Sequence, residues 1–235
     1  MTGHRYRWDR RSRARVAQPT AGRVFCLALW VLSGPALNSA AAAGPASPAP
    51  PARANFAQEP ASADARYVAD WAIGSGDSQG LPFLVVDKKQ ARVYVFAADA
   101  SLRGTAPALL GLAVGDEAVP GIGDRKLSTI RPDERTTPAG RYLTSIDRNL
   151  QGHEILWVDY ASALSLHPVI TTNAKERRAE RLASPTPLDN RISYGCINVT
   201  ADFFREVVKP VFTRTNGIVY VLPETRPVQQ EFAPH

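Results

Sequence analysis

The stretch PFLVVDKKQARVYVFAA, residues 82–98, decides the fold class. Two apolar runs flank the polar tripeptide KKQ, and this arrangement is typical of a β-hairpin. In the second run, Tyr94 and Phe96 alternate with Val93 and Val95, so an extended chain places the two pairs on opposite faces. The stretch therefore predicts two neighbouring strands.

Further strand-like runs lie on the C-terminal side of this hairpin. Each is a short segment of mainly apolar side chains bounded by turn-forming residues. They are ALLGLAV at 108–114, GRYLTSI at 140–146, EILWVDY at 154–160, ALSLH at 163–167 and GIVYVL at 217–222. Most of the domain is therefore expected to be β.

Helical periodicity occurs in two places. Residues 64–73 predict a short amphipathic helix that opens the domain and ends at Gly74. Residues 201–212 carry an apolar stripe behind Thr200, a candidate N-terminal cap, and Pro210 is expected to bend the end of this helix. The predicted fold class is thus mainly β with few helices.

Composition divides the chain into four parts. An Arg-rich start, an apolar run at 24–37 and an Ala-rich tract predict that residues 1–43 are a secretory signal peptide, with an uncleaved membrane anchor as the alternative. Residues 44–66 are rich in Ala, Pro and Ser and are predicted to be a linker. The folded domain is predicted at 67–225, with a tail at 226–235. We therefore expect export to the periplasm or cell envelope.

The formal net charge of +6 comes from the N-terminal arm. Seven of the 28 basic residues and one of the 22 acidic residues precede residue 44, which leaves 21 of each sign in the rest of the chain. A basic arm is not a folded basic face, so no nucleic-acid partner is expected. Membrane contact is expected only through the N-terminal segment if it stays uncleaved, and the oligomeric state is not predicted.

The chain has two cysteines, Cys26 in the apolar run and Cys196 in the predicted domain. If the signal peptide is cleaved, Cys196 is the single thiol of the mature protein and cannot form an internal disulfide. In an exported protein such a thiol is an intermolecular bridge, an inert buried side chain or a reactive nucleophile.

The surroundings of Cys196 favour the reactive thiol. Cys196 lies in RISYGCINV, between strand-like residues and the helix predicted at 201–212. Gly195 and a short loop expose backbone N–H groups near the sulfur, and the N-terminal end of the helix adds positive potential. Both effects stabilise a thiolate over a thiol.

A thiol nucleophile needs a base, and the predicted domain contains His153 and His167. His167 is the better candidate, because it ends the alternating run ALSLH and Pro168 stops the strand there. His153 follows a glycine in a predicted turn, where an exposed structural histidine is the simpler interpretation.

Three elements in this order make residues 82–223 similar to the YkuD-type L,D-transpeptidase catalytic domain. The signature of that family is a strand-borne His, a spacer, and then Ser/Thr-His-Gly-Cys-x-Asn/Arg. Here a 28-residue spacer follows His167 and Cys196 stands in SYGCIN at 193–198. Upstream, TTPAGRY at 136–142 resembles the Thr-Pro-x-Gly-x-Phe/Tyr element of the family.

This resemblance implies an L,D-transpeptidase-like β-sandwich that carries a His/Cys site. Cys196 is then the nucleophile and His167 the general base, with the backbone amides of Gly195 and Cys196 receiving the oxyanion. The implied substrates and partners are the stem peptides of peptidoglycan. The residues expected to bind substrate or the oxyanion are Arg191, Ser193, Tyr194, Gly195 and Asn198.

Two features depart from the family pattern. Tyr194 stands where the family has His, so the role of base falls on His167 alone. The spacer holds a charged insertion at 175–189, predicted to be a short basic helix and a loop. The insertion is either a solvated face or a lid that contacts anionic cell-wall groups. Arg191 is either a partner for a substrate carboxylate or a structural residue.

The expected activity is acyl transfer through a thioester on Cys196, for cross-linking or protein attachment. A hydrolase on the same scaffold, such as an L,D-carboxypeptidase, endopeptidase or amidase, differs only in the acceptor. A non-catalytic wall-binding module is the alternative from another class, although it has no need of a reactive thiol. The sequence contains no cluster with metal-ligand spacing, so neither a metal nor a cofactor is expected.

Overall fold

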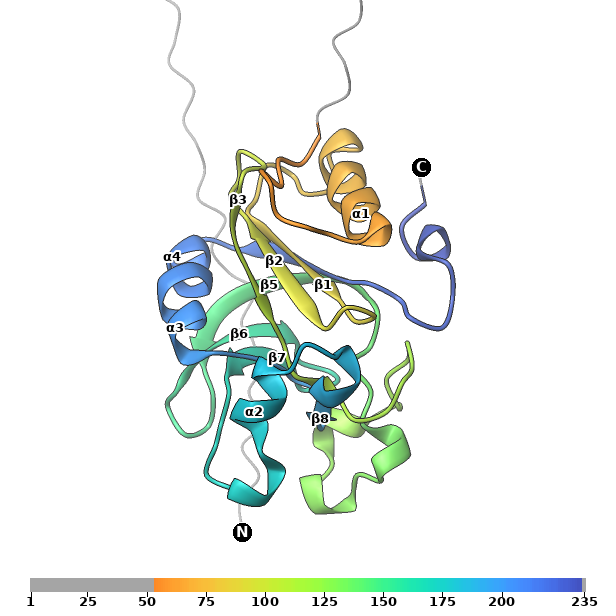
Figure 1. The fold of residues 1–235 in the computed structure, drawn as a ribbon, viewed down its shortest axis with the longest axis vertical. Coiled ribbons are helices and arrows are strands. Elements are labelled where there is room, and N and C mark those ends of the chain that lie inside the picture. The colour runs from red at the N-terminus through yellow and green to blue at the C-terminus, as the bar shows by residue number, and fades with distance from the viewer. Residues whose placement is uncertain (1–52, 234–235) are drawn as a thin grey trace, which may run out of the picture. The chain divides into compact units, whose positions relative to one another are not determined.

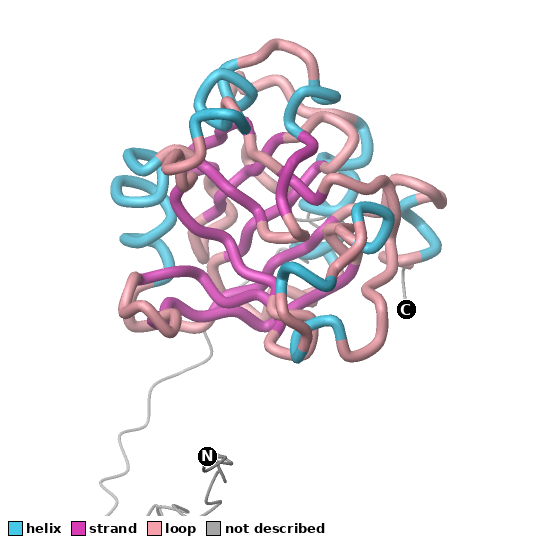
Figure 2. Tube along the Cα trace, turned by 90° about the horizontal axis from the view of Figure 1, so that it is seen from below, coloured by secondary structure: helices cyan, strands magenta, loops and turns pink. Residues whose placement is uncertain are grey.

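One eight-stranded sheet dominates residues 53–233, the part of the chain that the computed structural model describes (Figures 1 and 2). The signal peptide or anchor predicted at 1–43 lies outside the described residues. In spatial order the strands are β3 (Leu102–Pro107), β2 (Arg92–Phe96), β1 (Phe83–Asp87), β10 (Gly217–Val221), β5 (Gly140–Arg148), β6 (Glu154–Asp159), β7 (Leu164–Pro168) and β9 (Ile197–Val199). Two short strands, β4 (Leu110–Gly111) and β8 (Arg191–Ser193), form a separate parallel pair.

Two pairs of neighbours in the large sheet are parallel, and both matter for its layout. β1 pairs with β10 near the middle, and β7 pairs with β9 at the edge that carries the motif residues. The other neighbours are antiparallel. The predicted hairpin is confirmed as β1 and β2, with Val85 opposite Tyr94. Of the strand predicted at 108–114, only the two residues of β4 are extended.

The sheet is buried on both faces, which explains its long apolar runs. In β1, Leu84 and Val86 belong to one core cluster, whereas Phe83 and Val85 belong to another. The first cluster also contains side chains of β6, β7 and β9, so the two halves of the continuous sheet share one core. The predicted fold class, mainly β with few helices, is confirmed. The two layers of the expected β-sandwich are formed by two halves of one continuous sheet.

Helix α1 (Ala63–Gly74) covers the face of the sheet to which Phe83 and Val85 of β1 belong (Figure 1). Ser62 caps it by accepting a hydrogen bond from Ala65 N at 3.0 Å. Val68 and Ala72 are fully buried against the aromatic side chains of β1, β2 and β10. The helix predicted at 64–73 is therefore confirmed, one residue longer at each end.

The late helix follows β9 and packs on the shared core. It consists of α3 (Ala201–Phe203), a wider π-helical turn at Phe204–Val208 and α4 (Lys209–Phe212). Thr200 caps it as predicted, since its hydroxyl accepts from Phe203 N at 3.2 Å. The irregularity precedes Pro210: the Lys209 N–H reaches back to the Phe204 carbonyl, five residues earlier.

The folded unit is longer at both ends than the predicted 67–225. Phe56, inside the predicted linker 44–66, is 3% exposed and packs edge-on against the rings of Tyr94 and Phe96. Phe232, inside the predicted tail 226–235, is 1% exposed and contacts the ring of Tyr220. The buried aromatic side chain of each segment thus contributes to holding that segment on the core. Within residues 53–233 no helix is long and apolar enough to cross a bilayer.

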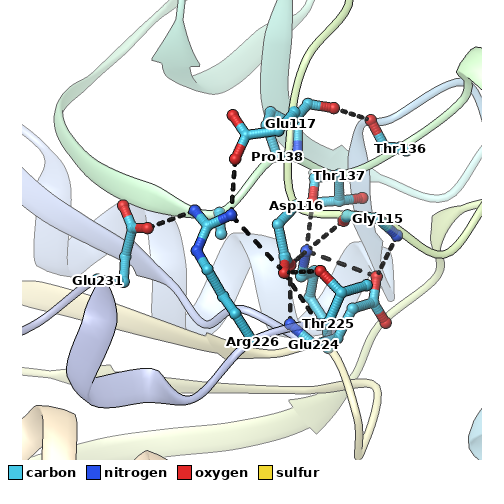
Figure 3. Close-up of polar contacts among 12 residues, drawn as sticks. Gly115, Asp116, Glu117, Thr136, Thr137, Pro138, Glu224, Thr225, Arg226 and Glu231 are labelled. Atoms are coloured by element: carbon cyan, nitrogen blue, oxygen red, sulfur yellow. Dashed lines mark hydrogen bonds and ion pairs between the residues drawn. The ribbon is translucent and has the colours of Figure 1, made fainter.

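A buried ionic network lies under the loop that joins β4 to β5 (Figure 3). The Lys88 ammonium donates to Asp116 Oδ1 at 2.8 Å and lies 3.5 Å from Glu224 Oε1, with its side chain fully buried. Asp116 also accepts from the backbone N–H groups of Glu224 and Thr225 at 2.7 and 2.9 Å. Burial alone would raise the pKa of Asp116, but these donors outweigh it and hold that pKa well below its ordinary value.

The Asp116→Asn variant should be less stable at pH 7 by about 3 kcal/mol, because it removes the charge paired with a buried ammonium. A carboxylate with a depressed pKa stabilises the fold above the pKa of the unfolded state, about 3.9, and this contribution disappears as the pH falls through the folded-state pKa. Urea unfolding should therefore show a gap between wild type and variant that narrows below about pH 4. Asp202→Asn, at an exposed position, is the control and should change little. Equal stabilities of wild type and Asp116→Asn at pH 7 would contradict this account.

Candidate active site

The candidate site lies on one face of the parallel pair β7 and β9. His167 is the register partner of Asn198, and Ser165 lies two residues earlier on the same face of β7. Cys196 lies two residues before Asn198, and its Sγ is 3.6 Å from Ser165 Oγ. The parallel register thus brings near each other two residues, His167 and Cys196, that have 28 residues between them in the sequence.

The loop before Cys196 requires a glycine. Gly195 has φ = +133°, and a Cβ at this position would lie 2.7 Å from the Thr136 carbonyl oxygen. Ser193 braces the same loop: its hydroxyl accepts from Gly195 N at 3.1 Å and donates to the Cys196 carbonyl at 2.6 Å. The backbone around the thiol is therefore fixed from both sides.

Cys196 and His167 shift each other's pKa in opposite directions. Burial alone would raise the pKa of the Cys196 thiol, but hydrogen bonding and charge interaction with His167 outweigh burial and lower this pKa. Burial alone would lower the pKa of His167, but the interaction with Cys196 outweighs it and raises that pKa. Both shifts move the pair toward thiolate and imidazolium.

The imidazole of His167 is held at both nitrogens. Its Nδ1 lies 2.9 Å from the Pro168 carbonyl, and its Nε2 lies 3.0 Å from Asn198 Nδ2. Arg178 donates to Asn198 Oδ1 at 2.9 Å, so the amide group must present its NH₂ to the ring. This chain of donors assigns the proton of the neutral ring to Nδ1, where it is donated to the Pro168 carbonyl.

The inserted segment contributes one residue to this arrangement. Helix α2 (Arg178–Ala183) begins with Arg178, whose side chain is 13% exposed and also pairs with Glu176. The rest of the insertion predicted at 175–189 is mostly exposed, and Leu182 is its one buried residue. Arg178 therefore supports the base through Asn198. The charge run KERRAER marked the segment, but nothing in the sequence singled out Arg178.

Three of the predicted substrate-binding residues have structural partners instead. Arg191 lies 12% exposed and forms an ion pair with Glu224, so its guanidinium is not available to a substrate carboxylate. Ser193 is 3% exposed and braces the loop, and Asn198 is fully buried beside His167. The Gly195 N–H, predicted to receive the oxyanion, donates to Ser193 instead. The Cys196 N–H has no acceptor within residues 53–233 and is left as the oxyanion donor.

Tyr194 and Cys196 line a narrow cleft of about 20 Å³. The Arg135 guanidinium lies over the Tyr194 ring, 4.0 Å from its centroid. The other walls come from three segments distant in sequence, represented by Ile122, Thr136 and Ala163. Of the predicted substrate-binding side chains, Tyr194 is therefore the one that lines this cleft together with the Cys196 thiol.

A larger cavity of about 520 Å³ borders His167. Apolar side chains such as Val169 and Phe204 make up much of its wall. His153 also lies at this cavity, in the turn between β5 and β6, and is exposed as predicted. Among residues 53–233, no group of three or more His, Cys, Asp and Glu side chains is arranged to hold a metal ion.

Comparison with known proteins identifies similar solved structures only. No protein-family model matches the chain, and no curated protein matches it. The helical cell shape determining protein Pgp2 from Campylobacter jejuni is 14% identical with a TM-score of 0.39, over 66% of this chain and 55% of that one. Its K307A mutant gives a TM-score of 0.40 at the same identity, over 67% and 55%. The chain thus spans about half the length of the Pgp2 structures.

The catalytic domain of the L,D-transpeptidase from E. faecium is also similar. The identity is 14% and the TM-score 0.35, over 60% of this chain and 96% of that domain.

Proposed function

We propose that this protein is a cysteine acyltransferase that acts on peptidoglycan stem peptides through a thioester on Cys196. The observation that carries the proposal is the placement of Cys196 beside the face of β7 and β9 that bears His167, with its Sγ 3.6 Å from Ser165 Oγ. In this setting the pKa of the thiol is lowered and that of the imidazole is raised. An inert structural cysteine needs no such partner, and burial alone would raise its pKa. The substrate class follows from the motif resemblance at 136–142, 167 and 193–198.

The first half of the reaction is acylation. The Cys196 thiolate attacks the carbonyl carbon of the donor peptide, and the carbonyl π electrons move to oxygen, where the Cys196 N–H stabilises the negative charge. The C–N bond then breaks as the imidazolium of His167 gives its proton to the leaving amine. The products are a thioester on Cys196, a free amine and a neutral His167.

The second half is transfer to an acceptor. Neutral His167 removes a proton from an amine as that amine attacks the thioester, and the Cys196 thiolate leaves with the bonding pair. Water in place of the amine turns the same steps into hydrolysis. The Nδ1–H of His167 donates to the Pro168 carbonyl in both protonation states, so this contact keeps the ring aligned for both proton transfers. Asn198 Nδ2 can donate only to the unprotonated Nε2 of the neutral ring, so the imidazolium form releases that contact.

The test is intact mass of the purified protein after incubation with a carbapenem, together with its reaction on tetrapeptide-bearing muropeptides. We expect one adduct, on Cys196, and cross-linked muropeptide dimers. Shortened muropeptides without dimers would replace the transferase with a hydrolase on the same site. No adduct and unchanged muropeptides would overturn the proposal in favour of a wall-binding module.

A further inference from the structure

The hydroxyl of Thr137 connects the β4 backbone to the loop of the nucleophile. It accepts a hydrogen bond from Gly111 N at 2.9 Å and lies 2.6 Å from the Gly195 carbonyl oxygen. A carbonyl cannot donate, so the single hydroxyl proton goes to Gly195. Thr137 is fully buried, which makes both hydrogen bonds strong and costly to lose.

Fixing the Gly195 carbonyl also fixes the next N–H. The C=O and N–H of a trans peptide point in opposite directions, and none of the peptide bonds described in residues 53–233 is cis. The Cys196 N–H therefore points away from Thr137. Because Ser193 already occupies the Gly195 N–H, the Cys196 N–H is the backbone donor whose direction matters for an oxyanion at the thiol.

The buried ionic network holds Thr137 itself in place (Figure 3). The Lys88 ammonium donates to the Thr137 carbonyl at 2.9 Å and to the Gly115 carbonyl at 2.6 Å. On either side, Thr136 Oγ1 donates to the Glu117 carbonyl at 2.6 Å and Ala139 N donates to the Asp116 carbonyl at 2.9 Å. The segment around Thr137 is therefore anchored residue by residue.

We propose that Thr137 is a positioning residue that aims the Cys196 N–H at the oxyanion, acting through the Gly195 carbonyl with Lys88 as its anchor. This inference rests on the proposed acyl transfer at Cys196. It assigns to Thr137 an effect on reactions that place negative charge on a carbonyl oxygen. It assigns no effect on the ionisation of the thiol, which depends on His167.

Two reagents that attack the same sulfur separate these effects. Acylation by a carbapenem builds an oxyanion, whereas alkylation by iodoacetamide does not. In Thr137→Val, which keeps the shape and removes the hydroxyl, acylation should slow by roughly 10- to 100-fold while alkylation stays within about 3-fold of wild type. Thr137→Ser, which keeps the hydroxyl, should match wild type in both reactions.

The ratio of the two rates decides the result. Equal losses of acylation and alkylation in Thr137→Val, or no loss in either, would overturn the inference. If Thr137→Val does not fold, as judged by circular dichroism, the smaller Thr137→Ala variant takes its place in the same comparison. A wild-type protein that is alkylated but never acylated would instead contradict the proposed function.

Discussion

Replacing Cys196 with alanine is expected to abolish formation of the acyl-enzyme. The variant lacks the sulfur that forms the thioester, and the neighbouring Ser165 hydroxyl has no base comparable to the His167 imidazole beside it. The measurement is intact mass after carbapenem treatment, where wild type should gain one adduct and Cys196→Ala none. The loss exceeds that of any other substitution proposed for this protein.

Serine at the same position makes the expectation sharper. Cys196→Ser keeps the size and the hydrogen-bonding capacity of the side chain, but a hydroxyl ionises far less readily than a thiol in the same surroundings. It should therefore remain unacylated while its thermal unfolding midpoint stays close to that of wild type. An adduct on either Cys196 variant would place the nucleophile elsewhere in the chain.

The sequence was sufficient for the parts of the fold that depend on local periodicity. The alternation at 82–98 predicted β1 and β2, and the apolar stripe behind Thr200 predicted the late helix. The predicted bounds 67–225 were too narrow, because long-range contacts hold the residues that flank them. Phe56 and Phe232 find their partners far along the chain, and composition does not reveal such contacts.

The site divides in the same way. The spacing of motif elements located Cys196 and His167, which the parallel register of β7 and β9 brings to one face. For Arg191 the sequence left a substrate role and a structural role open, and its ion pair with Glu224, 33 residues later in the sequence, favours the structural role. Thr137 belongs to the TTPAGRY motif at 136–142, but its role was not predicted. Its hydrogen bond with Gly195 joins residues 58 positions apart, and such a contact produces no periodic pattern in the sequence.

The pH dependence of the site follows from the same Cys196 and His167 pair. The lowered pKa of the thiol means that thiolate persists below about pH 8.5, the usual thiol value, and is lost only as the pH falls through the lowered pKa. The imidazolium of His167 protonates the leaving amine. Because the pKa of His167 is raised, the imidazolium persists above the pH at which an ordinary histidine loses its proton, and it is lost as the pH rises through the raised pKa. Acylation should therefore be fastest at pH values between the pKa of the Cys196 thiol and the pKa of His167.

His167→Ala should slow acylation by roughly 10²- to 10⁴-fold, the usual scale for loss of a general acid and base. Without the imidazole, the largest influences that oppose burial are lost and only the hydrogen bonds with Ser165 remain against it. The pKa of the thiol therefore rises, and the pH profile of iodoacetamide alkylation should move to higher pH. The comparison is His153→Ala, which removes an exposed imidazole from the turn between β5 and β6 and should leave the alkylation profile in place. A profile that moves in His153→Ala and stays in His167→Ala would assign the base to the other histidine. Because alkylation needs no leaving-group proton, a displaced profile isolates the effect of His167 on the thiolate from its effect on the amine.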